Sequence, residues 1–401
     1  MTDTQGLGRL QEVNVATDLI RSARSFQPSI FTTMTETALK YGAINLAQGV
    51  PDFEPPTELI ESARDALRRG LHQYTPSIGL QELRESIARH VNQQYGVQYD
   101  ADSEVTVTSG ATEAIWSAVT ALLGPGDEAI IVAPFYELYP ACVTAAGGKP
   151  RFVQTRFPEF RLDLDELESA FCERTRLVFL NTPANPSGTL LTREARALVG
   201  SLAEKHGAFV ISDETYEHIL FDDAVHTPVA AEPSCTPRTI TVSSVSKTFS
   251  ATGWRIGWAL GPRQLTDPLR RVHQFVVFAA PTALQKAVAD VLTVAAQTDY
   301  LRRLRQEFAA RRETLLAYLR EAGLEATQPQ GAYFVMVKID RDDVEFCETM
   351  ASRNGVAAMP GSYFFDRGIG GRRLIRLSFC KKQQTLQEAG RRLVAAVREL
   401  A

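Results

Sequence analysis

The sequence predicts an α/β fold, in which a large domain with a mostly parallel sheet between helices is accompanied by a smaller α+β domain. Two observations carry this prediction. From Glu104 onward, short runs rich in Val, Ile and Phe alternate with amphipathic stretches, as in βαβ units. After about residue 290 the pattern changes to a long arginine-rich stretch and then to short mixed elements. A chain of 401 residues can bury a large core in two or three domains.

Residues 1–46 are polar and irregular, so they are expected to form an N-terminal arm and part of the small domain. Apolar runs are expected to be strands, because parallel strands covered on both faces are apolar throughout. Amphipathic stretches such as Ala114–Leu123 and Thr192–His206 are expected to be connecting helices, the second with Thr192 as its N-cap. The strands are predicted at Glu104–Val107, Glu128–Val132, Arg151–Gln154, Leu177–Leu180, Ala208–Ile211 and Thr239–Val242.

The large domain is expected to cover residues 47–290 and the small domain residues 291–401. In the small domain, periodicity predicts a long arginine-rich helix, then a strand, a second helix and a second strand. These elements are predicted at Leu301–Glu321, Ala332–Val337, Asp343–Asn354 and Leu374–Ser378.

Composition and charge exclude several classes of function. The 43 basic and 47 acidic residues give a formal net charge of −4 without any basic block, so nucleic acid is not an expected partner. The five cysteines are never spaced as CxxC and the six histidines are scattered, which argues against disulfides and a metal site. No signal pattern opens the chain, and no run reaches the roughly 18 apolar residues of a membrane span. A cytoplasmic protein without membrane contact is therefore expected.

The residues that follow the predicted strands indicate a ligand site, because ligands of open parallel sheets bind outside the carboxyl ends of the strands. The turn Thr108–Thr112 offers backbone N–H groups to an anion, Phe135 offers an aromatic face, and a Pro-bracketed loop orients Asn185. Asp213 ends an apolar strand, where an ionised carboxylate needs a cationic partner. Each of these features also has a purely structural alternative. The turn could be a tight loop without a ligand, Phe135 a core side chain, and Asp213 the N-cap of the segment that follows.

Lys247 is the most informative residue at these strand ends. Only eight of the 43 basic residues are lysines, and Lys247 lies between hydroxyl residues and the aromatic segment Trp254–Trp258. An amine beside cationic Arg255 and away from bulk water has a lowered pKa, as a Schiff-base nucleophile requires. A solvated surface lysine is the alternative. The motifs GxGxxG, GxxxxGK[ST], HExxH and GxSxG are absent, so dinucleotide, P-loop, zinc-protease and hydrolase sites are not indicated.

Together these residues resemble the fold type I pyridoxal-phosphate aminotransferases of class I/II. Asp213 stands 28 residues after Asn185 and 34 residues before Lys247. Arg255 follows Lys247 by 8 residues, and all three spacings are those of the family. The resemblance runs from about Phe31 to the C-terminus and is strongest to the methionine aminotransferases and the kynurenine–glutamine transaminase (cysteine-conjugate β-lyase) subgroup. The matching segments are Asn185–Gly188, Asp213–Tyr216, Ser244–Lys247, Gly253–Gly257 and Arg376, with Ile44–Phe53 and Gln73–Pro76.

The resemblance implies pyridoxal 5'-phosphate as cofactor. Lys247 is implied to form the Schiff base, and Asp213 to pair with the protonated ring nitrogen, so that the ring can accept electrons from the substrate. Tyr216, the third catalytic residue, and Asn185 are implied to hydrogen-bond the phenolic oxygen, and Phe135 to stack on the ring. The residues implied to hold the phosphate are Gly110, Ala111, Thr112, Ser244, Arg255 and, from a second subunit, Tyr74. Because Tyr74 would come from the second subunit, the resemblance also implies a homodimer with shared active sites.

For the substrate, the resemblance implies that Arg376 clamps the α-carboxylate with its planar fork. Asn185 is implied to help bind it. Gly49 would let the backbone approach the substrate, and Phe31 and Phe278 would line an apolar pocket, Phe278 across the dimer interface. Such a pocket suits methionine or an aromatic side chain better than a dicarboxylic acid. Mammalian kynurenine transaminases carry a Trp in the N-terminal substrate segment and a His after the pocket Phe, and their absence here argues against kynurenine.

The predicted function is transfer of the amino group of an L-amino acid of methionine, glutamine or aromatic type to a 2-oxo acid by a ping-pong mechanism. Lys247 is expected to move the proton. A carbon–sulfur β-lyase acting on cysteine conjugates is the alternative on the same scaffold. A non-catalytic half of a transcription regulator is disfavoured, because only about 45 residues precede the family-like core.

Overall fold

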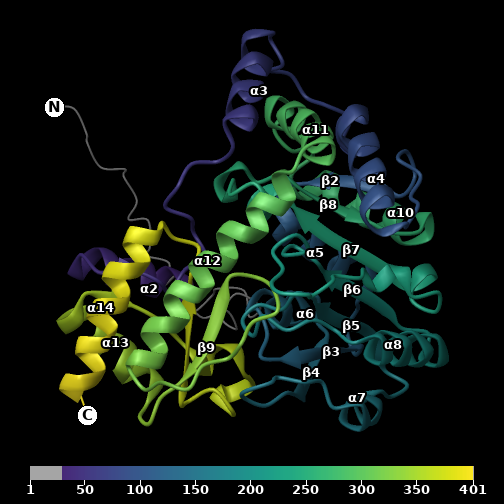
Figure 1. Ribbon diagram of the computed structural model, residues 1–401. Helices are drawn as coiled ribbons and strands as arrows, with labels where there is room; N and C mark the ends of the chain where they lie inside the picture. The colour runs from purple at the N-terminus through teal and green to yellow at the C-terminus, as the bar shows by residue number, and fades with distance from the viewer. Residues whose placement is uncertain (1–28, 401) are drawn as a thin grey trace, which may run out of the picture.

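The computed structural model describes residues 29–400, so residues 1–28 of the predicted N-terminal arm lie outside the described part. A seven-stranded sheet forms the centre of the larger part of the molecule (Figure 1). All neighbouring strands are parallel except the one at Gly257–Leu260, which is antiparallel to both neighbours. In spatial order the strands are β2 (Val105–Thr108), β8 (Gly257–Leu260), β7 (Thr239–Ser244), β6 (Phe209–Asp213), β5 (Thr175–Asn181), β3 (Glu128–Ala133) and β4 (Lys149–Gln154).

Six of these strands are the predicted ones, with ends shifted by at most two residues. Strand β8 was not among the predictions. It has only four residues and begins directly after Arg255 and Ile256, where Arg255 adopts a left-handed backbone conformation with φ 54°. This turn sends the chain back beside β7, and such a short return strand has no alternation long enough to stand out in the sequence.

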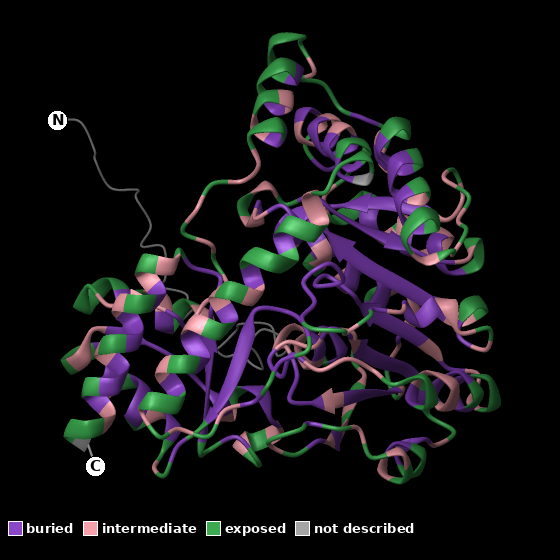
Figure 2. Ribbon diagram, viewed as in Figure 1, coloured by how far each residue is buried: buried purple, intermediate pink, exposed green. Residues whose placement is uncertain are grey.

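Helices cover both faces of the sheet, which explains why its central strands are almost entirely buried. The covering helices are α5 (Gly110–Leu122), α6 (Leu138–Ala145), α7 (Leu164–Ala170), α8 (Arg193–His206) and α10 (Arg263–Val276). Successive residues of a strand point to opposite faces. Ile131 and Phe179 therefore share a core with α5, whereas Ile130 and Val178 share another with α7 and α8. Figure 2 shows the central strands buried and the outer helix faces exposed, whereas the edge strand β4 is only partly buried.

The helices predicted at residues 114–123 and 192–206 are thus confirmed as α5 and α8. The hydroxyl of Thr192 accepts a hydrogen bond from the Ala195 N–H at 3.2 Å, so Thr192 is the N-cap, as predicted. A third helical layer covers β2 and β8, where Leu59, Leu83 and Leu260 share one core. Its helices are α3 (Thr57–Arg68), α4 (Gln81–Tyr95) and α11 (Thr282–Gln297).

The C-terminal elements form a second, smaller assembly. Its antiparallel sheet has the order β11 (Met359–Pro360), β12 (Leu374–Ser378) and β9 (Phe334–Lys338). Its helices are α12 (Tyr300–Glu321), α13 (Asp343–Asn354) and α14 (Gln383–Leu400), and the helices and strands predicted for this region are found at these places.

The N-terminal helix α2 (Ile30–Tyr41) lies against this C-terminal assembly, in contact with α13 (Figure 1). The short strand β1 (Ile44–Asn45) then pairs in parallel with β10 (Val356–Ala357). The chain therefore begins its described course beside its own C-terminal elements and crosses to the large sheet after residue 46.

Candidate active site

The carboxyl ends of β5, β6 and β7 lie side by side and carry the residues that the sequence singled out. In the register of the sheet, Asn181 is paired with Asp213, and Asp213 with Val242. A cavity of about 250 Å³ opens at this edge. The predicted site residues that line it are Phe31, Gly49, Ala111, Thr112, Asn185, Asp213, Tyr216, Ser244, Lys247, Arg255 and Arg376.

Lys247 projects into this cavity from the short helix α9 (Val245–Thr248), which follows β7 directly. Its Nζ lies 5.5 Å from the ring centroids of both Tyr216 and Tyr333. Enclosure in the protein lowers the pKa of Lys247 to about 8, and the nearby Arg255 adds to this effect. The expected lowering is thus confirmed, with burial as a larger cause than the arginine. Near pH 8 about half of the amine is neutral and able to act as a nucleophile.

Asp213 is the last residue of β6 and its carboxyl group is buried. The Tyr139 hydroxyl donates to Oδ2 at 2.8 Å, and the N–H and hydroxyl of Thr215 donate to Oδ1. Burial raises the pKa of Asp213, while these hydrogen bonds and Lys247 oppose the rise. Within residues 29–400 no Lys, Arg or His forms a salt bridge with it. A buried carboxylate facing the cavity in this way fits a cationic ring nitrogen of a bound cofactor.

The start of α5 and Arg255 form the anion-binding end of the cavity. Free N–H groups at a helix N-terminus and a guanidinium are the groups that bind phosphate. Gly110 does not line the cavity, but its φ of 74° is a left-handed conformation that favours glycine, and a Cβ on it would lie 2.3 Å from an Arg255 nitrogen. The buried hydroxyl of Ser246, which sequence reasoning missed, has no hydrogen-bond partner within the described residues. These groups fit the phosphate of pyridoxal phosphate.

Arg376, in the middle of β12, is fully buried and also lines the cavity. It donates to Asn185 Oδ1 at 2.7 Å and to the carbonyl of Ala47, and its guanidinium lies 4.1 Å from the ring centroid of Phe334. Burial lowers the pKa of Arg376 to about 10. It pairs with no carboxylate in the described chain, and its Nε has no acceptor there. A buried guanidinium with a free donor beside a cavity is suited to bind a substrate carboxylate.

Gly49 lines the cavity, and the structure gives a steric reason for its lack of a side chain. A Cβ at this position would lie 2.6 Å from the Tyr333 ring and 2.9 Å from the Phe334 ring. The Tyr333 hydroxyl also donates to the Gly49 carbonyl at 2.8 Å. Sequence reasoning missed both aromatic residues, because Tyr333 directly precedes β9 and Phe334 begins it, and both reach the site only through the packing of the small sheet.

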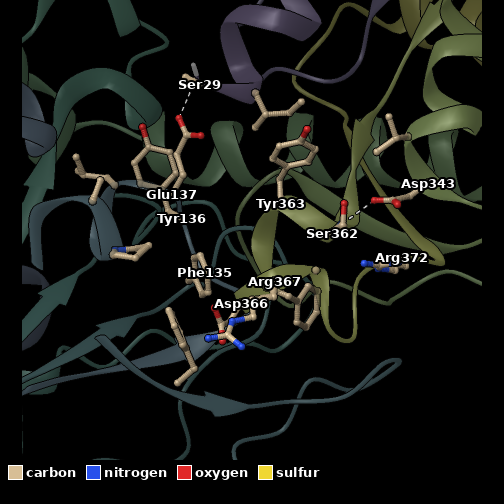
Figure 3. Close-up of a pocket in the computed structure, with 18 of the residues that line it drawn as sticks. Ser29, Phe135, Tyr136, Glu137, Asp343, Ser362, Tyr363, Asp366, Arg367 and Arg372 are labelled. Carbon is tan, nitrogen blue, oxygen red and sulfur yellow. Dashed lines mark hydrogen bonds between the residues drawn. The ribbon is translucent and has the colours of Figure 1, made fainter. Parts of the chain in front are cut away.

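Phe135, predicted to stack on the cofactor ring, does not line the cavity that contains Lys247. Its ring stacks on Phe152 with centroids 5.0 Å apart and borders a second cavity of about 880 Å³, which Tyr136 also lines (Figure 3). The next residue, Tyr136, borders the cavity that contains Lys247. Adjacent side chains of an irregular segment point in different directions, so a shift of one residue changes which ring faces the site. Tyr139, which donates to Asp213, was also missed, because it reaches the site from α6 through a contact between distant residues.

Which of these two aromatic rings contacts the cofactor can be tested directly. We expect Tyr136→Leu to weaken pyridoxal-phosphate binding by about threefold to tenfold, since it removes the ring that faces the cavity. Phe135→Leu should leave that affinity unchanged but lower the free energy of unfolding by about 1–2 kcal/mol, because Phe152 loses its partner. Cofactor titration and urea unfolding of both variants measure the two effects. Weakened binding in Phe135→Leu alone would restore the original assignment.

Tyr74 and Phe278 do not line the cavity of their own subunit. Their rings lie edge to face with centroids 5.2 Å apart, and the side chains are 86% and 47% exposed. Phe275 and Val276 at the end of α10 are exposed close by in the sequence. These residues form an exposed aromatic patch on the surface of a single chain.

Two further expectations concern metals and membranes. Among residues 29–400 there is no group of three or more His, Cys, Asp or Glu side chains that could hold a metal ion. In the same range, no helix combines the length and apolar character needed to cross a membrane. All five cysteines are free.

A parallel sheet whose carboxyl edge presents a lysine of lowered pKa, a buried aspartate and an anion-binding helix end defines a pyridoxal-phosphate enzyme of fold type I. Residues 41–393 match the family model "Aminotransferase class I and II", and the chain belongs to this family. The protein is a pyridoxal-phosphate-dependent aminotransferase.

Relatives and solved structures agree with this assignment. The chain is 41% identical to the methionine aminotransferase of Escherichia coli, over 91% of this chain and 95% of the relative. It is 33% identical to a kynurenine–oxoglutarate transaminase of Dictyostelium discoideum, over 92% of this chain and 94% of the relative. The structure of N-succinyldiaminopimelate aminotransferase from Mycobacterium tuberculosis superimposes with a TM-score of 0.91 at 38% identity, covering 94% of this chain and 100% of that one.

Proposed function

We propose that this aminotransferase uses an L-amino acid with an uncharged side chain, of methionine, glutamine or aromatic type, as amino donor. The observation that carries this proposal is the charge of the cavity wall. Among the described residues that line it, the only charged ones are Asp213, Lys247, Arg255 and Arg376. Arg255 lies at the phosphate end, which leaves Arg376 as the one guanidinium for substrate. Arg376 can pair with the α-carboxylate of the donor, but no further cation among the described lining residues is available to pair with the side-chain carboxylate of a dicarboxylic amino acid.

The cavity wall near Arg376 is largely apolar, which suits an amino donor with an uncharged side chain. Phe31, Val50 and Phe334 contribute to this part of the wall. The similarity to a methionine aminotransferase supports the same substrate class. The carbon–sulfur β-lyase alternative has no support in the site or in the relatives beyond membership of the shared family.

The residues of the cavity divide the work of a ping-pong transamination. Pyridoxal phosphate, when bound, supplies an electron sink for the charge left at the substrate Cα as its proton departs. Lys247 holds the cofactor between turnovers and, once displaced by the amino acid, takes the Cα proton. Arg376 and Asn185 orient the donor through its carboxylate, and Asp213 keeps the ring nitrogen cationic. Hydrolysis, which consumes one water, would release the 2-oxo acid, and the same residues would then serve the reverse sequence with a second 2-oxo acid.

The visible spectrum of the purified holoenzyme tests this proposal without any amino acceptor. L-Methionine, L-glutamine, L-phenylalanine and L-kynurenine are added one at a time, with L-aspartate and L-glutamate as matched dicarboxylic controls. We expect the yellow colour to bleach to the pyridoxamine form with methionine or an aromatic donor and not with the controls. Faster bleaching with the dicarboxylic acids would refute the substrate class, and release of pyruvate from a cysteine conjugate without an acceptor would favour the lyase.

We also propose that the protein is a homodimer with shared active sites. The exposed patch around Tyr74 and Phe278 supports this, because large apolar groups exposed together mark an interaction surface. Tyr74 of one subunit would donate to the cofactor phosphate of the other. Tyr74→Phe is then expected to raise the dissociation constant of pyridoxal phosphate by about tenfold, since a hydrogen bond to a charged group is lost. Cofactor titration and sedimentation of this variant check the claim, and a monomeric wild-type holoenzyme would disprove it.

Two finer assignments belong with these proposals. The proposed division near residue 46 is supported by the packing of α2 against α13 and by the separate sheets on either side. The proposed division at residue 290 falls inside α11, which packs on α3 and α4, so the packing favours a boundary between α11 and α12. A cytoplasmic location is supported by the five cysteines, which are all free.

A further inference from the structure

A buried ion pair lies behind the anion-binding end of the cavity, between α10 and α5. His273 of α10 is completely buried, and its Nδ1 lies 3.0 Å and 3.1 Å from the two carboxylate oxygens of Glu113. On its other side, Nε2 lies 2.8 Å from the carbonyl oxygen of Ser77. A carbonyl oxygen only accepts hydrogen bonds, so Nε2 must carry a proton.

The partners of Glu113 show that Nδ1 also carries a proton. One carboxylate oxygen accepts from the Ser109 N–H at 3.1 Å, and the other accepts from the Ser117 hydroxyl at 2.5 Å. A carboxylate surrounded by donors is ionised, and His273 is then a third donor to it. His273 is therefore an imidazolium in the folded protein.

The charges around His273 agree with this protonation state. Burial lowers the pKa of His273, but the hydrogen bond and charge of Glu113 and the Ser77 carbonyl outweigh it, so the pKa is raised on balance. Arg270, one turn earlier on α10, opposes the rise. Its guanidinium is held by Thr106 and by the carbonyls of residues 102 and 105.

The pair joins three segments that serve the proposed active site. Glu113 is in the first turn of α5, next to the cavity-lining residues Ala111 and Thr112. Ser77 follows Tyr74 by three residues, and Phe278 follows His273 by five. The contacts of one imidazolium thus fix the end of α5 that takes the phosphate and the segment that presents Tyr74 to the other subunit.

We propose that His273 is a positioning residue for cofactor binding, which in its doubly protonated form holds the phosphate-binding end of α5 and the Tyr74 segment in register. The part that concerns Tyr74 rests on the proposed shared site of the homodimer. The contribution is complete below pH of about 6.5, the ordinary pKa of histidine, and is lost as the pH rises through the raised pKa of His273.

The test compares apoenzymes of the wild type and of His273→Gln in titrations with pyridoxal phosphate from pH 7 to pH 9.5. The glutamine amide keeps a donor but carries no charge at any pH. We expect the dissociation constant of the variant to exceed that of the wild type by about tenfold at pH 7, with the ratio falling toward one as the wild-type imidazolium loses its proton. The ratio cancels the titration of Lys247 and of the cofactor itself, which both proteins share.

A ratio near one at every pH, or a ratio that stays constant with pH, would overturn the proposal, because a merely structural role would not follow the charge. His206→Gln, the same exchange at the end of α8, is the matched control and should bind like the wild type. Glu113→Gln should reproduce the loss, and it decides the question if His273→Gln does not fold. Failure of the wild type itself to bind the cofactor would instead refute the assignment of the site, so the two failures are distinguishable.

Discussion

Lys247→Ala is expected to lower transamination by about 10⁴-fold or more, because the substitution removes both the nucleophile and the proton carrier. The effect should fall on the chemical step. The phosphate end, built from the start of α5 and Arg255, is intact in the variant, so it should still bind pyridoxal phosphate, although without the covalent bond.

Stopped-flow measurement of the half-reaction with L-methionine, together with cofactor titration, separates these two effects. Lys205→Ala is a matched control, since Lys205 is exposed in the last turn of α8, away from the cavity. Turnover of the Lys247→Ala variant within a few fold of the wild type would rule out the role of this lysine.

Arg376→Lys is expected to lower kcat/KM for the amino donor by about 10²- to 10³-fold. The buried guanidinium holds Asn185 and the Ala47 carbonyl while its remaining donors are free for a carboxylate. A lysine ammonium is a point charge that cannot present the same planar fork, and a poorly paired buried charge costs several kcal/mol. Affinity for pyridoxal phosphate should change little, because the hydrogen bonds of Arg376 go to Asn185 and Ala47 and not to Arg255 or the start of α5.

A donor without a carboxylate sharpens this second experiment. The wild type should strongly prefer L-phenylalanine to 2-phenylethylamine, and Arg376→Lys should lose most of this preference. Arg373→Lys makes the same exchange at an exposed position just before β12 and should behave as the wild type. An unchanged preference in Arg376→Lys would show that another group binds the carboxylate.

The large sheet could be predicted because its strands are covered on both faces. Doubly covered parallel strands are rich in apolar residues, so β3, β5 and β6 stand out as runs of Val, Ile, Leu and Phe, and β7 places Ile and Val between small hydroxyl residues. The rule that ligands bind at the carboxyl ends of such strands then led from these runs to Asn185, Asp213 and Lys247. Local pattern and a general packing rule were sufficient for this part of the site.

Other features depend on contacts between segments that are distant in the chain. The sequence could not show that Tyr136 rather than Phe135 faces the cavity, because the backbone direction at that turn is set by the surrounding packing. Tyr333 and Phe334 reach the site only because β9 pairs with β12 beside it. The partnership of His273 and Glu113 joins residues 160 positions apart.

The sequence by itself determined the class of the fold, the order of its main elements and the chemistry of the active-site residues, since each depends on residue type and local periodicity. Only the tertiary structure decided which charges are buried, which of them lack partners and which ring faces the cofactor site. Burial and pairing are properties of surroundings assembled from distant segments. Hence Arg376, read in the sequence as one arginine of a short strand, becomes in the fold a buried cation with donors free for a substrate carboxylate.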